Sequence, residues 1–173
     1  MDSLKKLNFD DIKLRLIAPS DNNSLANLIR STLEEFGANH PGTVYFDETT
    51  DHLYEVFQQE PRSAYFIAES DGDVVGGGGI FPSNGLPTDT CELVKMYLYP
   101  KARHIGLGKL IIQKCIETAK RLGFKRIYIE SMPELKQALR TYEKFGWEYL
   151  KSPLGNTGHH GCDLWMIKKI EEV

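Results

Sequence analysis

Residues 92–129 constrain the fold more than any other stretch of the chain. Their sequence predicts a strand at the start, a helix over Gly106–Leu122 and a short buried strand over Arg126–Ile129. Within the helix, apolar residues recur every three or four positions, and Gly123 follows the last turn, where many helices end on glycine. Two strands joined through a helix pair in parallel with a right-handed crossover. The stretch therefore indicates an α/β fold built around a parallel strand pair.

The rest of the chain adds helices and strands on both sides of this unit. Periodicity and turn residues predict further helices over residues 20–35, 50–59 and 134–145, and further strands over 13–17, 63–69, 74–81, 147–151 and 164–170. We found no internal repeat, low-complexity tract or linker. We therefore expect one α/β domain spanning residues 1–173, with a mixed sheet and helices on both faces.

Composition limits the class of protein. With 41% hydrophobic and 26% charged residues, the chain is typical of a globular domain. No apolar run approaches the ~18 residues that cross a bilayer, and the first residues lack the apolar core of a signal peptide. The three cysteines, Cys91, Cys115 and Cys162, form no CxxC pair, which disfavours a disulfide scaffold or a zinc ribbon. We expect a cytoplasmic protein with reduced thiols and no membrane partner.

Charge is distributed unevenly along the chain. Residues 1–90 carry an excess of Asp and Glu, whereas residues 91–173 carry an excess of Lys and Arg. A nucleic-acid-binding domain commonly has an isoelectric point above about 9, but the value here is about 6.0. The basic half therefore fits a compact polyanion better than a nucleic acid. A solvated basic helix surface is the simpler alternative.

The start of the long helix has the features of a phosphate site. In residues 99–110 a strand ends, a short loop carries Arg103 and His104, and Gly106 and Gly108 lie where the helix begins. Backbone N–H groups at a helix start have no helical acceptor, and the helix dipole adds partial positive charge. Glycine lets a phosphate approach this backbone closely. Ordinary strand-to-helix packing can give the same pattern, and the segment lacks the GxGxxG and GK[ST] signatures.

Two motifs resemble the GNAT superfamily of acyl-CoA-dependent N-acyltransferases. Arg103–Gly108 (RHIGLG) is similar to the family motif [RQ]-x-x-G-x-[GA], and Ala138–Trp147 (ALRTYEKFGW) is similar to the family helix A-x-x-L-Y-x-x-x-G-F. The order of the predicted elements also matches that family. The resemblance implies a single-domain fold with a mixed, centrally splayed sheet. It also implies N-acetyltransferase activity with acetyl-CoA as the cosubstrate.

The resemblance further implies which residues bind the cofactor. The backbone of Met96, Tyr97 and Leu98 would line the pantetheine arm and the acetyl group, with the Leu98 N–H facing the thioester oxygen. The pyrophosphate would lie on the residues that follow, which are Arg103, His104, Ile105, Gly106, Leu107, Gly108 and Lys109. Two positions depart from the family pattern, because Leu135 stands where the family often has Asn, and Thr141 where it has Leu.

Acetyl transfer to an amine needs an acceptor for the amine proton and a donor for the leaving thiolate. By resemblance, Tyr142 is the acid, and a phenol stays protonated at neutral pH. Glu92 is the preferred base, acting through water, and Glu130 is the next choice. Simpler interpretations stay open: Tyr142 as an aromatic core residue, and Glu92 as a carboxylate paired with Lys95 or Lys125. The expected reaction is direct attack in a ternary complex.

Two other segments invite functional interpretations. Gly76–Gly79 is followed by no helix, so a floor for the acceptor is preferred to a second phosphate site. Gly158–Cys162 (GHHGC) holds too few ligands for a tetrahedral metal site, so no metal is expected. We interpret this segment as a hairpin turn, or as a loop over the acceptor pocket in which one histidine assists as a base.

The acceptor is expected to be a small amine or a peptide that contacts residues 36–50 and their flanks. Acidic side chains there would attract a cation, and aromatic ones could wall the pocket; they are Glu34, Glu35, Asp47, Glu48, Asp51, Tyr45, Phe46 and Tyr54. A solvated acidic face is the alternative. The rival function is a non-catalytic acyl-CoA-binding or sensor domain. Homodimers are common in the resembled family, and the sequence leaves the oligomeric state open.

Overall fold

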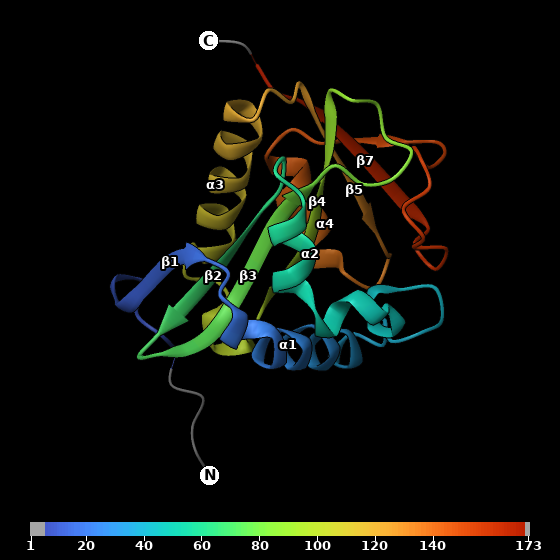
Figure 1. The fold of residues 1–173 in the computed structure, drawn as a ribbon. Coiled ribbons are helices and arrows are strands. Elements are labelled where there is room, and N and C mark those ends of the chain that lie inside the picture. Colours follow the sequence, from blue (N-terminus) through green and yellow to red (C-terminus); the bar gives the residue numbers. More distant parts are fainter. Residues whose placement is uncertain (1–5, 172–173) are drawn as a thin grey trace.

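A computed structural model describes residues 6–171 as a seven-stranded sheet with helices on both faces (Figure 1). The strands lie in the order β1-β2-β3-β4-β5-β7-β6. Their bounds are β1 Ile12–Leu16, β2 Ala64–Ser70, β3 Asp73–Phe81, β4 Thr90–Leu98, β5 Arg126–Ser131, β6 Glu148–Leu150 and β7 Leu164–Lys169. Neighbouring strands are antiparallel, except that β4 and β5 are parallel.

Each face of the sheet has its own core. Helices α1 (Asn22–Glu35) and α2 (Leu53–Gln59) pack on one face, where their apolar side chains meet alternate strand residues such as Tyr65. Helices α3 (Leu107–Arg121) and α4 (Lys136–Lys144) contribute to the core on the opposite face. The α/β class predicted from the sequence, with helices on both faces, is confirmed. Among the described residues, no helix has the length and apolar character to cross a membrane.

The predicted helix over residues 50–59 begins later than expected. Residues 48–51 form a 3₁₀ turn, and α2 starts only at Leu53. The turn is capped by Asp47, whose Oδ1 accepts a hydrogen bond of 2.9 Å from the Thr49 amide. A side chain that bonds its own neighbouring backbone competes with a regular helix start, and this competition explains the difference.

The parallel pair β4–β5 opens after three residue pairs. Thr90, Cys91 and Glu92 pair with residues 126–128, and no further pairs between these strands occur in the described chain. On its other edge, β4 stays paired with β3 as far as Leu98. The sheet therefore has a central seam bordered by residues 93–98 of β4, and the expected central splay is confirmed.

A β-bulge in β4 lies beside this seam. The register with β3 shifts by one residue, so that Lys95 and Met96 together lie opposite Gly78. Lys95 has φ +50°, in the left-handed region that residues other than glycine rarely adopt. The hydroxyl of Tyr65 donates a hydrogen bond of 2.7 Å to the Lys95 carbonyl oxygen. Tyr65 belongs to β2, so this hydrogen bond reaches across β3 and stabilises the bulge in β4.

The glycine run Gly76–Gly79 in β3 makes room for this arrangement. A Cβ atom at Gly77 would lie 2.8 Å from the Tyr65 hydroxyl oxygen, and one at Gly79 would lie 2.4 Å from the Ala64 carbonyl oxygen. A Cβ atom at Gly78 would lie 2.7 Å from the sulfur of Met96. The space beside the glycines is thus filled by the chain's own atoms. These residues do not provide the floor for an acceptor that the sequence suggested.

We expect Gly79→Ala to lower the free energy of unfolding by about 1–3 kcal/mol, because the new methyl group would press on backbone that cannot move freely. Urea denaturation measures the loss. The matched control is Gly108→Ala in the first turn of α3, where a Cβ atom would lie 3.6 Å from its nearest neighbour, an ordinary contact. Equal destabilisation by the two substitutions would contradict this account of the glycine run.

Candidate active site

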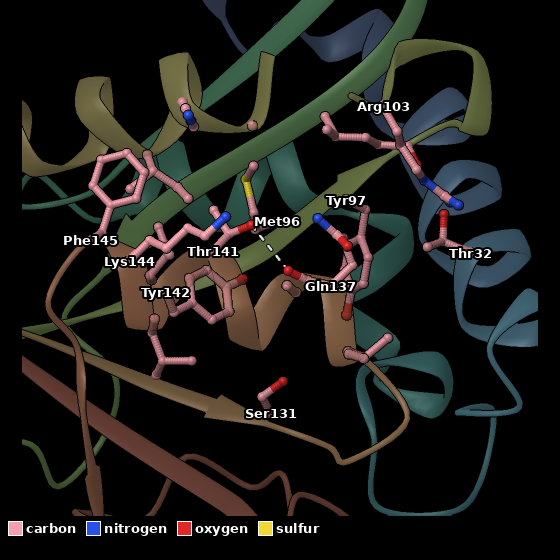
Figure 2. Close-up of a pocket in the computed structure, with 18 of the residues that line it drawn as sticks. Thr32, Met96, Tyr97, Arg103, Ser131, Gln137, Thr141, Tyr142, Lys144 and Phe145 are labelled. Atoms are coloured by element: carbon pink, nitrogen blue, oxygen red, sulfur yellow. Dashed lines mark hydrogen bonds between the residues drawn. The ribbon is translucent and has the colours of Figure 1, made fainter. Parts of the chain in front are cut away.

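A cavity of about 470 Å³ lies at the seam of the sheet. Met96 of β4 and Tyr142 and Gln137 of α4 converge on it, with Ser131 at the end of β5 (Figure 2). Among the residues predicted to bind a cofactor, its lining includes Met96, Tyr97, Leu98, Arg103, His104, Gly106, Gly108 and Lys109. The side chains of the other two, Ile105 and Leu107, pack against the core instead.

The first turn of α3 presents backbone N–H groups to one end of this cavity. The first helical hydrogen bond runs from the Leu110 amide to the Gly106 carbonyl, so the amides of residues 107–109 precede it and have no acceptor within the helix. His104 and Gly106 have φ of +62° and +92°, which curl the loop before the helix. With the positive end of the helix dipole added, this turn can hold an anion.

The backbone of Leu98 presents a hydrogen-bond donor to the middle of the seam. The next amide, that of Tyr99, donates to the Val75 carbonyl in β3 at 3.0 Å. Successive amides of an extended strand point to opposite edges, so the Leu98 N–H points away from β3, where β5 has diverged. This direction is the one that a donor to a bound thioester oxygen would need.

The side chain of Arg103 is already engaged within the protein. Its two terminal nitrogens donate to the carboxylate of Glu35 in α1 at 2.7 and 2.8 Å, and its Nε donates to the Leu98 carbonyl at 3.0 Å. The guanidinium also lies 5.1 Å from the ring centre of Phe36. Although Arg103 lines the cavity, its side chain ties the loop to α1 and is not free to bind a phosphate in this arrangement.

Tyr142 projects from α4 into the cavity (Figure 2). The residue is only 6% exposed, and its ring packs edge-on against Trp147 with a centroid separation of 5.9 Å. Burial raises the pKa of the Tyr142 phenol well above its usual value. The hydroxyl is therefore protonated throughout the physiological range and can donate a proton or a hydrogen bond.

Glu92 lies at the point where β4 and β5 part. It is the last β4 residue paired with β5, and it is only 3% exposed. Its Oε2 accepts a hydrogen bond of 2.5 Å from the Ser83 hydroxyl. Burial raises the pKa of Glu92 to about 7, so the carboxyl can gain or release a proton near neutrality.

Three carboxylates converge on the imidazole of His159, in the loop between β6 and β7. Its Nδ1 lies 3.8 Å from Glu92 Oε1 and 3.6 Å from Glu130 Oε2. Its Nε2 lies 3.5 Å from Asp47 Oδ2, and the Lys95 ammonium lies 3.9 Å from the same oxygen. The sequence drew attention to each of these segments, but it gave no sign that they meet in space.

Each partner in this group titrates away from its ordinary range. Burial opposes the charge on His159, but its contacts with Asp47 and Glu130 prevail and raise the His159 pKa to about 9. The contact with His159 holds the pKa of Asp47 well below its usual range, against the effect of burial. Burial also favours neutral Glu130, but contacts with His159, Thr157 and Tyr128 outweigh it and lower that pKa. His159 is thus an imidazolium between ionised carboxylates at neutral pH.

Comparison with known proteins assigns the chain to a family. Residues 27–147 match the Acetyltransferase (GNAT) family. The protein belongs to this family. It is also 40% identical to an Escherichia coli relative called uncharacterized N-acetyltransferase YjgM, over 91% of this chain and 94% of the relative.

Solved GNAT structures share the fold of this family member. An acetyltransferase of Staphylococcus aureus has a TM-score of 0.81 at 18% identity, covering 92% of this chain and 99% of the other. An N-acetyltransferase of Thermoplasma acidophilum, solved with coenzyme A, has a TM-score of 0.70 at 18% identity, covering 91% and 98% of the two chains. The GNAT fold expected from the two sequence motifs is confirmed.

The second GNAT motif departs from the family pattern at residues that line the cavity. Leu135 immediately precedes α4, and Thr141 lies one residue before Tyr142; both line the cavity. The Thr141 hydroxyl donates to the Gln137 carbonyl at 3.0 Å, so it is engaged within the helix. Ser131 is a buried hydroxyl in the lining and offers a polar contact that Leu135 does not.

The acidic segment of this GNAT protein is mostly neutralised internally. Glu35 pairs with Arg103, Asp51 pairs with Arg30 at 2.7 Å, and Glu34 accepts a hydrogen bond from the Tyr45 hydroxyl. Of the carboxylates predicted to attract an acceptor, Asp47 is the one that contacts the group around His159. The aromatic side chain of Phe46 is 58% exposed.

Two further observations bear on the chemistry that the site can support. One ligand atom from each of Glu92, Glu130 and His159 lies within 4.8 Å of the other two. A protonated imidazole has no lone pair to offer a metal ion, so we interpret this trio as a cluster of charges. The three thiols are buried, and burial raises the pKa of Cys91 and of Cys162 to about 12. Such thiols are poor nucleophiles.

Proposed function

We propose that this protein is an acetyl-CoA-dependent N-acetyltransferase that transfers the acetyl group to an amine by direct attack in a ternary complex. The observation that carries the proposal is a cavity at the open seam that is lined by the protonated phenol of Tyr142, with Glu92, a carboxyl with a pKa of about 7, at the last residue pair before the seam opens. Glu92 itself does not line the cavity, which is why a water molecule has to relay the amine proton to it. The structures of relatives solved with acetyl-CoA or coenzyme A support this cosubstrate.

The cofactor would bind along the cavity from the α3 turn to the seam. Its pyrophosphate would accept hydrogen bonds from the amides of residues 107–109, with the side chain of Lys109 nearby in the lining. Its pantetheine arm would follow the free edge of β4 over Met96 and Tyr97. The thioester oxygen would then face the Leu98 N–H, which would stabilise the charge that develops during attack.

The reaction would move two protons. As the amine nitrogen attacks the thioester carbon, Glu92 accepts the amine proton through a water molecule, while the carbon–sulfur bond breaks. The coenzyme A thiolate takes a proton from the Tyr142 hydroxyl. The phenolate then regains a proton from solvent, Glu92 releases the proton that it accepted, and the amide and free thiol leave. No step is assigned to a metal or to a cysteine.

The setting of this activity follows from the same features. We infer that one domain, residues 1–173, carries the reaction, and that it works in the cytoplasm, where its three free thiols stay reduced. The acceptor is a small amine or a peptide, and a homodimer is the assembly that family precedent suggests. The alternative function, a non-catalytic acyl-CoA sensor, would bind the cofactor and turn over no amine.

Cofactor binding can be tested at Gly108, where a Cβ atom meets only ordinary contacts. We expect Gly108→Asp to weaken acetyl-CoA binding on the order of tenfold, because an added anion repels the pyrophosphate. Gly108→Asn has nearly the same size without the charge and should weaken binding less. Calorimetric titration measures both affinities. Equal affinities for the two variants would contradict a pyrophosphate at this turn.

The acid can be tested with Tyr142→Phe, which removes the hydroxyl and keeps the buried ring. We expect kcat to fall on the order of 100-fold, with acetyl-CoA affinity nearly unchanged. Tyr149→Phe is the matched control, because Tyr149 is exposed and bonds only to Glu143 among the described residues. A loss of affinity without a loss of rate at saturation would show that Tyr142 binds the cofactor and is not the acid.

The base can be tested through the pH dependence of kcat/KM. Because the pKa of Glu92 is raised to about 7, the carboxyl holds a proton below that pH, and activity should rise through pH 7, separately from the increase near pH ~10 where a free alkylamine loses its own proton. We expect Glu92→Gln to lower kcat/KM on the order of 100-fold and to abolish this rise. If Glu130→Gln abolishes the rise and Glu92→Gln does not, Glu130 is the base instead.

A further inference from the structure

The loop that carries His159 is fixed from several directions. The Gly161 amide donates to the Gly42 carbonyl at 2.8 Å, and the Asn156 amide donates to the Asn84 carbonyl at 2.8 Å. A Cβ atom at Gly42 would lie only 2.6 Å from the Gly161 nitrogen, so the two backbones are in direct contact. The loop backbone is therefore anchored on both sides of His159 by contacts that do not involve the imidazole.

Hydrogen bonds also orient the carboxylates around His159. Glu130 accepts hydrogen bonds from the Tyr128 hydroxyl at 2.8 Å and the Thr157 hydroxyl at 2.5 Å. Asp47 uses its Oδ1 to accept from Thr49, which leaves its Oδ2 for His159. The His159 side chain, 12% exposed, is thus enclosed by oriented negative groups.

Two carboxylates in one buried site normally cannot both stay ionised. Each raises the pKa of the other, and burial raises both. Glu92 and Glu130 come from the two strands that part at the seam, and the same His159 nitrogen lies within 3.8 Å of an oxygen of each. A positive charge at that nitrogen removes the conflict, because it attracts both anions at once.

We propose that His159 is a positioning residue whose imidazolium favours the ionised forms of Glu92 and Glu130 together. This inference deepens the proposed function, on which it rests, because an ionised Glu92 is the form that can accept the amine proton. His159 itself needs no contact with the substrate and undergoes no net proton transfer. Asp47 contributes by stabilising the imidazolium from the other side of the ring.

The remaining groups that face Glu92 do not replace this charge. Burial raises the pKa of Cys91, of Cys162 and of Tyr128, so these neighbours stay neutral near pH 7. Lys95 acts on Glu92 more weakly than His159 does, and burial lowers the Lys95 pKa. Loss of the imidazolium should therefore raise the pKa of Glu92 further, because no other neighbouring cation attracts the carboxylate as strongly.

The direct test is the titration of Glu92 by NMR in the cofactor-free protein labelled with ¹³C at glutamate carboxyls, with Glu92→Gln used for assignment. In His159→Gln we expect the Glu92 midpoint to move up by about one pH unit. His160→Gln is the matched control: His160 is the exposed neighbour, so the midpoint should stay at its wild-type value. His159→Lys restores a cation and should bring the midpoint back toward that value.

The ¹⁵N chemical shifts of the His159 ring in the wild-type protein provide an independent route if His159→Gln does not fold. They should show an imidazolium throughout the pH range in which Glu92 ionises. An unmoved Glu92 midpoint in the folded His159→Gln protein, or a neutral His159 ring at the Glu92 midpoint of the wild type, would overturn the inference.

The kcat/KM profile separates this inference from the proposed function. If Glu92 is the base, the rise in activity in His159→Gln moves to higher pH together with the NMR midpoint, and both proposals are supported. If the midpoint moves while the activity profile does not, the coupling of charges stands and the assignment of Glu92 as base fails.

Discussion

The hydrogen bond from the Tyr65 hydroxyl to the Lys95 carbonyl crosses a strand that has no side chains in its way. Because Gly77 and Gly79 leave room for the ring, the hydroxyl reaches the bulge and holds Lys95 at a positive φ. Beyond the bulge, β4 stays paired with β3 as far as Leu98, whereas its pairing with β5 has already ended at Glu92. The one-residue shift in register sets the direction of the Leu98 amide, and the cavity lies along this unpaired edge of β4.

The site separates two kinds of electrostatic environment. At the α3 end, backbone dipoles offer partial positive charge to an anion. At the Glu92 end, three carboxylates and two cations are gathered in a nearly closed group, and most of their charge is balanced internally. Tyr142, which also lines the cavity, has an apolar setting that keeps its proton in place. Acetyl-CoA bound along the cavity would have its phosphates in the positive environment at α3 and its thioester carbon near the apolar setting of Tyr142.

The sequence predicted local features well because they depend on neighbours along the chain. The period of residues 106–122, the two glycines at its start and the Arg103–Gly108 motif were enough to place the helix and the family. Contacts between distant segments could not be predicted. Nothing in the sequence indicated that Glu35 would form a salt bridge with the Arg103 guanidinium, or that the Tyr65 ring would fill the space beside Gly77 and Gly79.

The group around His159 shows the same limit. In the sequence, Asp47 is one of several acidic residues in one segment, and His159 is one of two adjacent histidines in a glycine-rich segment. Their meeting depends on backbone contacts such as Gly42 with Gly161, which involve no side chain and so leave no recognisable pattern. Only the fold brings these residues to Glu92.

Within residues 6–171, the sheet is continuous across its centre through three residue pairs. On one side lie β1 to β4, and on the other β5, β7 and β6. Apart from these pairs, the two halves are joined by core packing and by loop contacts such as Gly42 with Gly161. A ligand bound in the cavity would contact strands on both sides of the seam. Binding should therefore reduce the relative motion of the two halves of the sheet.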